Sequence, residues 1–199
     1  ITADLLARLG GVETVDAVRQ GAFAAVSALT TTGFVSDATV PWPPALPLLF
    51  LGLMFVGGAS GSTAGGVKLM RMMLAVRHGR RELARLSHSH GVVRINYGKA
   101  PVPERTMQAL WSFFVFFMSG FAALAVALSA FGLDAADATS MALATLANAG
   151  AGLPLVAGAD ASYAVLPDAS KWVLCLGMIL GRLELVAVVA LLTPMFWRR

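Results

Sequence analysis

The sequence predicts an all-α integral membrane fold with three full membrane spans and two re-entrant half-helices, which enter the membrane without crossing it. The chain is 57% hydrophobic and only 13% charged, and its mean hydropathy is +0.74, well outside the range of soluble domains. A soluble fold of 199 residues has too small an interior to hide this much apolar surface. The apolar stretches also come in two lengths, one sufficient to span a bilayer and one too short.

Positive charge is concentrated in one segment. Residues 68–105 carry nine Lys and Arg against two acids, a net charge of +7, whereas residues 1–44 carry −2 and residues 132–171 carry −3. Cytoplasmic loops collect Lys and Arg during insertion, so we expect 68–105 inside and the other two segments outside. Apolar spans flank the basic segment directly, which favours a membrane face over a nucleic-acid site. We therefore expect no nucleic-acid partner.

Three stretches are long enough to cross a bilayer, which takes about 20 apolar residues. They are residues 45–76, 107–131 and 171–197. Glycines interrupt the first stretch at 57–66, the second is unbroken, and the third contains Arg182 near its middle. Three crossings around a cytoplasmic 68–105 segment place the N-terminus outside and the C-terminus in the cytoplasm.

The N-terminal residues lack the positive and apolar regions of a signal peptide. An outside N-terminus without a signal is difficult to deliver across a membrane, so we expect further transmembrane segments upstream of this sequence.

Two shorter apolar segments, residues 16–32 and 134–149, each begin with an aspartate suited to a helix start. At about 14 residues and 1.5 Å per residue, each helix can penetrate the membrane but cannot cross it. Each then runs into a turn of small residues, and irregular backbone at that depth requires burial in protein or a water-filled cavity. An offset of 117 residues pairs Gly33 with Gly150 in these turns. The chain therefore reads as two copies of one unit: half-helix, turn and full span.

Such turns are suited to dehydrating a monovalent cation. Backbone carbonyls replace the water oxygens without adding net charge, and glycine allows the backbone to turn them inward. The C-terminal ends of the half-helices add the negative end of their dipoles. The candidate filter residues are Thr30, Thr31, Thr32, Gly33, Ala147, Asn148, Ala149 and Gly150. An ordinary turn between helices is the alternative for one copy, and the second copy favours a filter.

The glycine-rich interruption has too many glycines and hydroxyl residues for close helix packing alone. A mobile loop below the filter is then the remaining option. The candidate residues at this level are Gly57, Gly58, Gly61, Ser62, Thr63, Gly65, Gly66 and Arg182.

Two enzyme-like interpretations of this loop are weaker. The string GASG at 58–61 matches the nucleophile motif of rhomboid intramembrane proteases, but a serine nucleophile needs a histidine base within reach. The histidines of the chain, His78, His88 and His90, all lie in the basic segment. A phosphate-binding loop at 61–68 fails because a valine precedes the lysine and no strand precedes the loop. We expect no enzymatic activity and no organic cofactor.

Arg182 costs at least ~2.5 kcal/mol in the middle of a span unless it faces a cavity or a partner. Glu184 is two residues away, so on a helix the two side chains point in different directions. The repeat offset places Arg182 at the depth of the glycine-rich interruption. We therefore expect its guanidinium to donate to backbone carbonyls of 57–66 or to limit the ion path there electrostatically.

Several strings together resemble the C-terminal half of a TrkH-like subunit in the Trk/Ktr/HKT superfamily of potassium transporters. SALTTTGF at 27–34 and ANAGAGL at 147–153 resemble its third and fourth filter loops. GGASGSTAGGVK at 57–68 resembles the glycine-rich break of the following helix, and GRLE at 181–184 a motif of the last helix. The stretch from 80 to 90 is similar to its cytoplasmic connector.

The resemblance implies a potassium-channel-like fold of four helix–pore loop–helix repeats around one potassium path in a bacterial inner membrane. It also implies that the glycine-rich break, together with Arg182, acts as an intramembrane gate. Residues 1–76 then hold the half-helix, filter and broken second helix of repeat three, 77–106 the connector, and 107–199 repeat four. It further implies a homodimer, a TrkA-like cytoplasmic nucleotide-binding subunit and a missing N-terminal half of the pore, without which this chain does not conduct. A secondary transporter with discontinuous helices is the alternative transport class.

Overall fold

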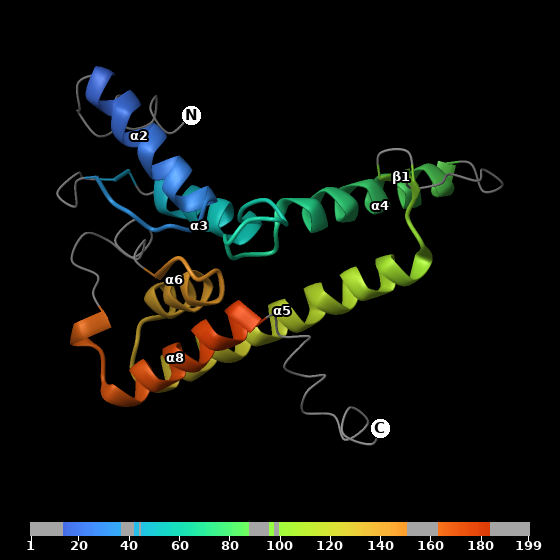
Figure 1. Cartoon of the computed structure of the whole chain (residues 1–199). Coiled ribbons are helices and arrows are strands. Elements are labelled where there is room, and N and C mark those ends of the chain that lie inside the picture. The colour runs from blue at the N-terminus through green and yellow to red at the C-terminus, as the bar shows by residue number, and fades with distance from the viewer. Residues whose placement is uncertain are drawn as a thin grey trace.

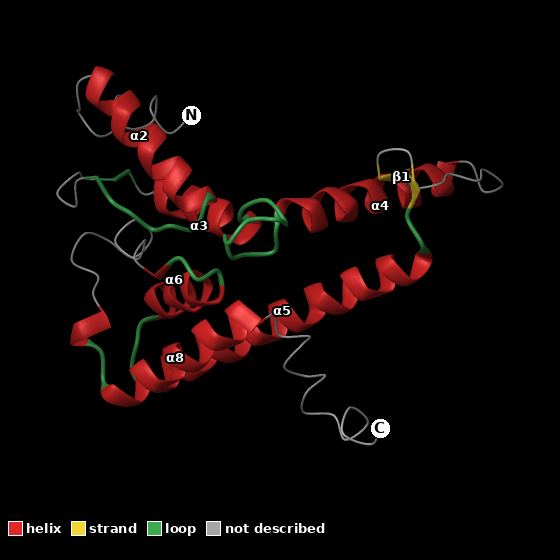
Figure 2. Cartoon of the chain, viewed as in Figure 1, coloured by secondary structure: helices red, strands yellow, loops and turns green. Residues whose placement is uncertain are grey.

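The computed structural model describes residues 14–36, 42–43, 45–87, 96–97, 100–150 and 163–183. Its described elements are α2 (Thr14–Leu29), α3 (Ala45–Val56), α4 (Leu69–Ser87), β1 (Asn96–Tyr97), β2 (Ala100–Pro101), α5 (Glu104–Ala130), α6 (Ala135–Leu146), the short 3-10 helix η2 (Tyr163–Val165) and α8 (Asp168–Leu183). Apart from one two-stranded antiparallel pair, β1 with β2, the described elements are helical (Figure 2).

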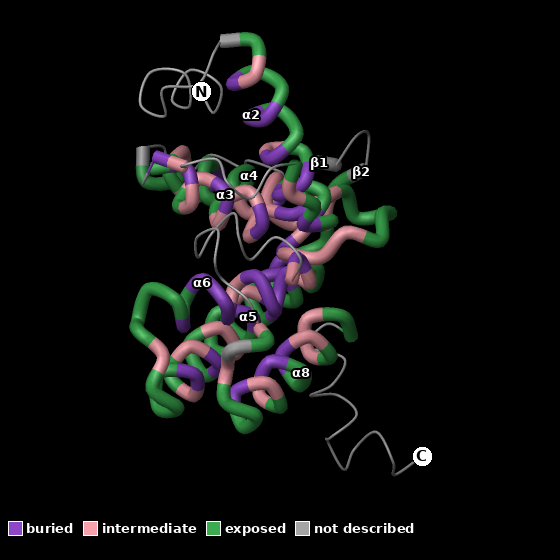
Figure 3. The backbone as a smooth tube through the Cα atoms, turned by 90° about the vertical axis from the view of Figure 1, so that its left-hand side faces the viewer, coloured by how far each residue is buried: buried purple, intermediate pink, exposed green. Residues whose placement is uncertain are grey.

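The helices lie in two layers. Figures 1 and 3 show α2, α3 and α4 on one side and α5, α6 and α8 on the other. The β1–β2 hairpin joins the layers at one end, and packing of α3 against α6 joins them in the middle. The loop between α3 and α4 therefore lies next to the end of α6.

The long apolar helix predicted at 107–131 is confirmed. α5 has 27 residues, about 40 Å at 1.5 Å per residue. Among the described helices, α5 alone is both long enough and apolar enough to cross a membrane. α3 is also apolar, but its 12 residues are too few to span a bilayer. The stretch predicted at 171–197 begins as α8, and its part beyond Leu183, including Glu184, lies outside the described residues.

The helix break predicted in the first apolar stretch is present. α3 ends at Val56 and α4 begins at Leu69. The second helix then continues without a break to Ser87, so the start of the predicted connector is helical. After the apolar run has ended, the chain continues as an amphipathic helix to Ser87, because the charged residues of this segment are good helix formers.

The two short helices predicted from the sequence are α2, with 16 residues, and α6, with 12 residues. Asp134 is the N-cap of α6, and its carboxylate accepts a hydrogen bond from the Ala136 N–H at 3.2 Å. This contact satisfies one of the backbone donors that every helix start leaves without an intrahelical partner.

The core lies where α6 is enclosed by α3, α5 and α8 (Figure 3). Phe50 and Met54 from α3, Leu128 from α5 and Leu146 from α6 are almost completely buried there. Gly177 of α8 allows close packing: a Cβ at this position would lie 2.8 Å from the Thr145 side chain and 2.9 Å from that of Leu124. Small residues at such crossings are typical of membrane helices.

A charged cluster joins α4 to the start of α5. Arg81 contacts Glu82 at 3.1 Å and Glu104 at 3.5 Å, and Arg85 also reaches Glu82 at 3.3 Å. Desolvation raises the pKa of the Glu82 carboxyl, but Arg81 and Arg85 outweigh it and hold this pKa below its ordinary value. The ion pairs thus favour the charged form of this carboxyl.

Candidate functional site

The site is built from the ends of the two short helices, and the first of these is the C-terminal end of α2. The chain there enters L1, residues 30–33. The Thr31 N–H donates to the Ala28 carbonyl at 3.2 Å, and the Thr32 N–H donates to the Ser27 carbonyl at 3.1 Å. Thr31 has φ +55°. This pair of bonds around a left-handed residue is a Schellman motif, which turns the chain sharply out of the helix.

The end of α6, which leads into L2 (residues 147–150), has the same motif. The Asn148 N–H donates to the Thr145 carbonyl at 3.0 Å, and the Ala149 N–H donates to the Ala144 carbonyl at 2.8 Å. Asn148 has φ +53°. Each of these residues lies 117 positions after its counterpart in α2 and L1. The two turns that the sequence paired therefore share one backbone conformation.

Thr31 and Asn148 hold this conformation at a cost. A non-glycine residue in the left-handed region stores roughly 1–3 kcal/mol, which persists only where the surroundings enforce it. The sequence predicted that glycine supplies this freedom. Gly33 has φ +77°, but in L2 the residue with positive φ is Asn148, whose short polar side chain tolerates the left-handed region better than most.

The glycine-rich loop (residues 57–66) folds back tightly between α3 and α4. Gly57 and Gly66 have φ +69° and +77°, and a Cβ on Gly57 would lie 2.2 Å from the Gly65 carbonyl oxygen. Beyond the loop, the Val67 N–H donates to the Phe55 carbonyl at 2.9 Å and the Leu69 N–H to the Gly58 carbonyl at 3.0 Å. The loop thus has a defined shape.

The glycine-rich loop contacts both L1 and L2. The Gly65 N–H donates to Thr31 Oγ1 at 2.8 Å. A Cβ on Gly65 would lie 1.9 Å from the Ala147 carbonyl oxygen, and a Cβ on Gly181 would lie 2.2 Å from the Leu146 carbonyl oxygen. Glycine is therefore required at both positions, because the backbones of the loop and of α8 approach the end of α6 directly.

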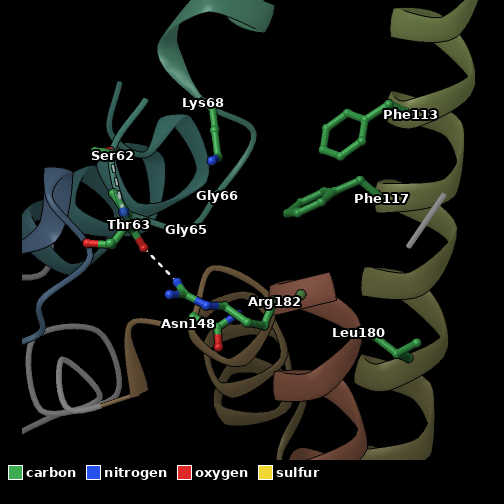
Figure 4. Close-up of a pocket in the computed structure, with 12 residues that line it drawn as sticks. Ser62, Thr63, Gly65, Gly66, Lys68, Phe113, Phe117, Asn148, Leu180 and Arg182 are labelled. Atoms are coloured by element: carbon green, nitrogen blue, oxygen red, sulfur yellow. Dashed lines mark hydrogen bonds between the residues drawn. The ribbon is translucent and has the colours of Figure 1, made fainter. Parts of the chain in front are cut away.

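Arg182 closes the site from α8. Its Nη1 donates to the Thr63 carbonyl oxygen at 2.6 Å (Figure 4), which confirms the expected contact with a backbone carbonyl of the loop. A cavity of about 290 Å³ surrounds this contact. Its lining residues are Ser62, Thr63, Ala64, Gly65, Gly66, Lys68, Phe113, Phe117, Asn148, Leu180, Gly181 and Arg182.

Most of the predicted loop residues meet here, but some do not. Gly61 has open space around its Cα, and together with Ser60 it lines a separate cavity near Met70. In the described part of the chain, no histidine lines either cavity that contains Ser60. His78 instead stacks edge-on against Trp111 at 5.7 Å, while His88 and His90 lie outside the described residues. Among the described residues, these cavities therefore contain no histidine that could act as a catalytic base for Ser60, as the protease interpretation requires.

The predicted filter and gate residues leave out six residues of the cavity lining: Ala64, Lys68, Phe113, Phe117, Leu180 and Gly181. The lysine carried one available signal, since it ends the glycine-rich string. The two phenylalanines carried none, because an apolar helix contains many equivalent aromatic residues. The described residues contain no cluster of three or more His, Cys, Asp or Glu that could hold a metal. The oxygen atoms available to a cation at the site belong to backbone carbonyls and hydroxyls.

Comparison with known proteins gives one consistent result. The model of a family described as TrkH, cation transport protein, matches residues 8–199. The Trk system potassium uptake protein TrkH of Halomonas elongata is 43% identical over 187 residues, covering 94% of this chain and 38% of that protein. TrkH of Escherichia coli K12 is 40% identical over 181 residues, covering 91% of this chain and 37% of that protein.

A solved structure agrees with these sequence relatives. The crystal structure of the potassium transporter TrkH from Vibrio parahaemolyticus superposes with a TM-score of 0.90 at 38% identity, covering 99% of this chain and 42% of that one. The chain therefore spans about two fifths of the length of these relatives.

Proposed function

Because this chain belongs to the TrkH family of cation transport proteins, we propose that it forms part of a potassium-uptake pore in a bacterial inner membrane. It supplies two of four filter arcs, L1 and L2, and one gate. The remaining arcs come from an N-terminal half of the same pore, and this part alone does not conduct.

One observation supports this proposal more than any other. α2 and α6 end in the same Schellman motif, with Thr31 and Asn148 in matching left-handed conformations 117 residues apart. Schellman motifs are common helix ends, but these two occur at matching positions of the repeat and hold a residue other than glycine in the left-handed region. Two arcs of one filter share such a turn because each must present its backbone to the same ion at the same depth.

In this mechanism L1 and L2 replace part of the hydration shell of a potassium ion with backbone and hydroxyl oxygens. Carbonyl dipoles attract the ion without a full negative charge, so it binds weakly enough to leave again. The negative ends of the α2 and α6 dipoles lie at the same loops and add to the attraction. The transported ion is the substrate, and the chain performs no covalent chemistry.

The glycine-rich loop acts as the gate below this filter. It is hydrogen-bonded to L1 through Thr31, it touches L2 at Ala147, and Arg182 contacts its Thr63 carbonyl. A loop joined to the filter on two sides blocks the ion path at rest. Displacement of α4, which directly follows the loop, opens it.

The basic α4 provides the cytoplasmic side of this mechanism, following the positive-inside rule. The N-terminus of the chain then lies outside and the C-terminus in the cytoplasm. A TrkA-like nucleotide-binding subunit docks on this inner face, and the complete transporter is a homodimer.

The test is isotope uptake by the full-length parent protein in liposomes. We expect uptake of ⁸⁶Rb⁺ above that of empty vesicles, suppressed by external K⁺ and much less by equal Na⁺. Uptake that Na⁺ suppresses as well as K⁺ does would contradict potassium transport. Uptake that stops when a proton or sodium gradient collapses, at constant voltage, would instead indicate a coupled secondary transporter.

A further inference from the structure

Lys68 adds a second positive charge to the cavity at the gate. The side chains of Lys68 and Arg182 enter this cavity from different parts of the chain, the residue directly before α4 and the end of the described part of α8 (Figure 4). No carboxylate is among the described residues that line the cavity. Within the same ranges, no ion pair joins either cation to an acid. Among the described residues, the two like charges thus share this cavity without an acidic partner.

The backbone of Lys68 is held in a conformation that lysine rarely adopts. Its φ is +75°, whereas left-handed residues are mostly glycine, asparagine or aspartate. The neighbouring residues on both sides are fixed: Val67 is fully buried and bonded to Phe55, and the Leu69 N–H is bonded to Gly58. The strained joint therefore fixes the direction in which the lysine side chain leaves the chain.

A left-handed backbone and a positive charge without an acidic partner among the described residues meet at this one position, and backbone strain of this kind is typical of functional sites. We propose that Lys68 is a second charged residue of the gate, whose ammonium group repels a cation in the cavity and so holds the resting pore closed. This role rests on the proposed potassium pore. Lys68 does not form part of the filter, so it affects how often ions pass and not which ion is selected.

The location of Lys68 also couples the barrier to gate movement. The residue lies between the glycine-rich loop and the first turn of α4, where the Met72 N–H bonds the Lys68 carbonyl at 3.2 Å. Any tilt or rotation of α4 therefore moves the ammonium group together with the helix. Opening the loop and withdrawing the charge become one event.

A charge series at this position in the full-length protein tests the proposal. Asn and Asp both tolerate positive φ better than Lys, so Lys68→Asn and Lys68→Asp relax the backbone while changing the charge. We expect the resting ⁸⁶Rb⁺ flux to rise about tenfold in Lys68→Asn, as for loss of one charge in a partly screened cavity, and further in Lys68→Asp. Lys68→Arg keeps the low flux, and the K⁺/Na⁺ preference is the same in all variants.

Lys171→Asn is the matched control, because this lysine lies on α8 in an exposed pair with Asp168. Its flux should equal that of the wild type. Equal flux in Lys68→Asn and wild type would overturn the proposal, and so would a rise in Lys68→Arg as large as in Lys68→Asn, which would indicate a purely steric role. If neither the wild type nor any Lys68 variant shows flux above empty vesicles, the proposed pore fails, and this inference fails with it.

Discussion

Replacing Thr31 by valine removes the hydroxyl that accepts the Gly65 N–H at 2.8 Å and keeps the shape of the side chain. Both residues are β-branched, so the strain of the positive φ is unchanged. Thr31 is only 7% exposed, which leaves the Gly65 N–H without a ready replacement partner. The substitution therefore isolates the link between L1 and the glycine-rich loop.

The size of the effect follows from the lost bond. Leaving a buried donor unpaired costs about 1–3 kcal/mol, while hydrogen bonds inside membrane proteins contribute about 0.6 and at most about 1.7 kcal/mol. The two ranges overlap near ~1.4 kcal/mol, which is a factor of about ten in an equilibrium constant. If the bond is present only in the closed gate, resting ⁸⁶Rb⁺ flux through the full-length Thr31→Val protein should rise about tenfold.

Thr139→Val is the matched control for this experiment. The Thr139 hydroxyl bonds to the Ala135 carbonyl within its own helix at 2.9 Å, on an exposed face of α6. We expect this variant to carry wild-type flux. If Thr31→Val behaves like Thr139→Val, the hydrogen bond does not hold the gate, and the coupling between filter and loop is refuted.

The remaining predictions concern stability, measured as thermal unfolding of the full-length protein in detergent. Gly177→Val should lower the unfolding free energy by about 1–3 kcal/mol, because its side chain collides with Thr145; no loss would contradict the close helix crossing. Asp134→Ala should cost about 1 kcal/mol through loss of the α6 cap, whereas Asp134→Asn should cost little. Because the folded-state pKa of Glu82 is depressed, its stabilising contribution is present above its ordinary pKa and is lost as pH falls through the lowered folded-state pKa. Glu82→Gln should flatten this acid-dependent loss, and an unchanged pH profile would show that the ion pair with Arg81 contributes nothing.

The helices could be predicted from the sequence because hydropathy and length are local properties. The break in the first apolar stretch, the unbroken α5 and the two short helices all follow from runs of apolar residues and their interruptions. The continuation of α4 to Ser87 did not follow from hydropathy. Its polar residues form an amphipathic helix, and the end of an apolar run does not mark the end of a helix.

The site was harder to predict, because its details depend on contacts distant in sequence. Glycines and hydroxyl residues identified the loops, and the repeat offset placed Arg182 near the glycine-rich loop. The left-handed conformations of Thr31, Asn148 and Lys68 are fixed by neighbouring backbone, and a single sequence gives no signal for them. The cavity likewise needs the glycine-rich loop, L2, α5 and α8 to be assembled before its lining exists.

The most direct test of the account locates the ion itself. Crystals of the full-length protein grown in Rb⁺ or Tl⁺ should show anomalous scattering peaks between L1 and L2, within about 3 Å of oxygens from both loops, as expected when such oxygens replace ion hydration. The peaks should disappear when the ion is exchanged for Na⁺. Peaks elsewhere in the protein, or contacts with only one of the two loops, would contradict the claim that Thr31 and Asn148 shape two arcs of one filter.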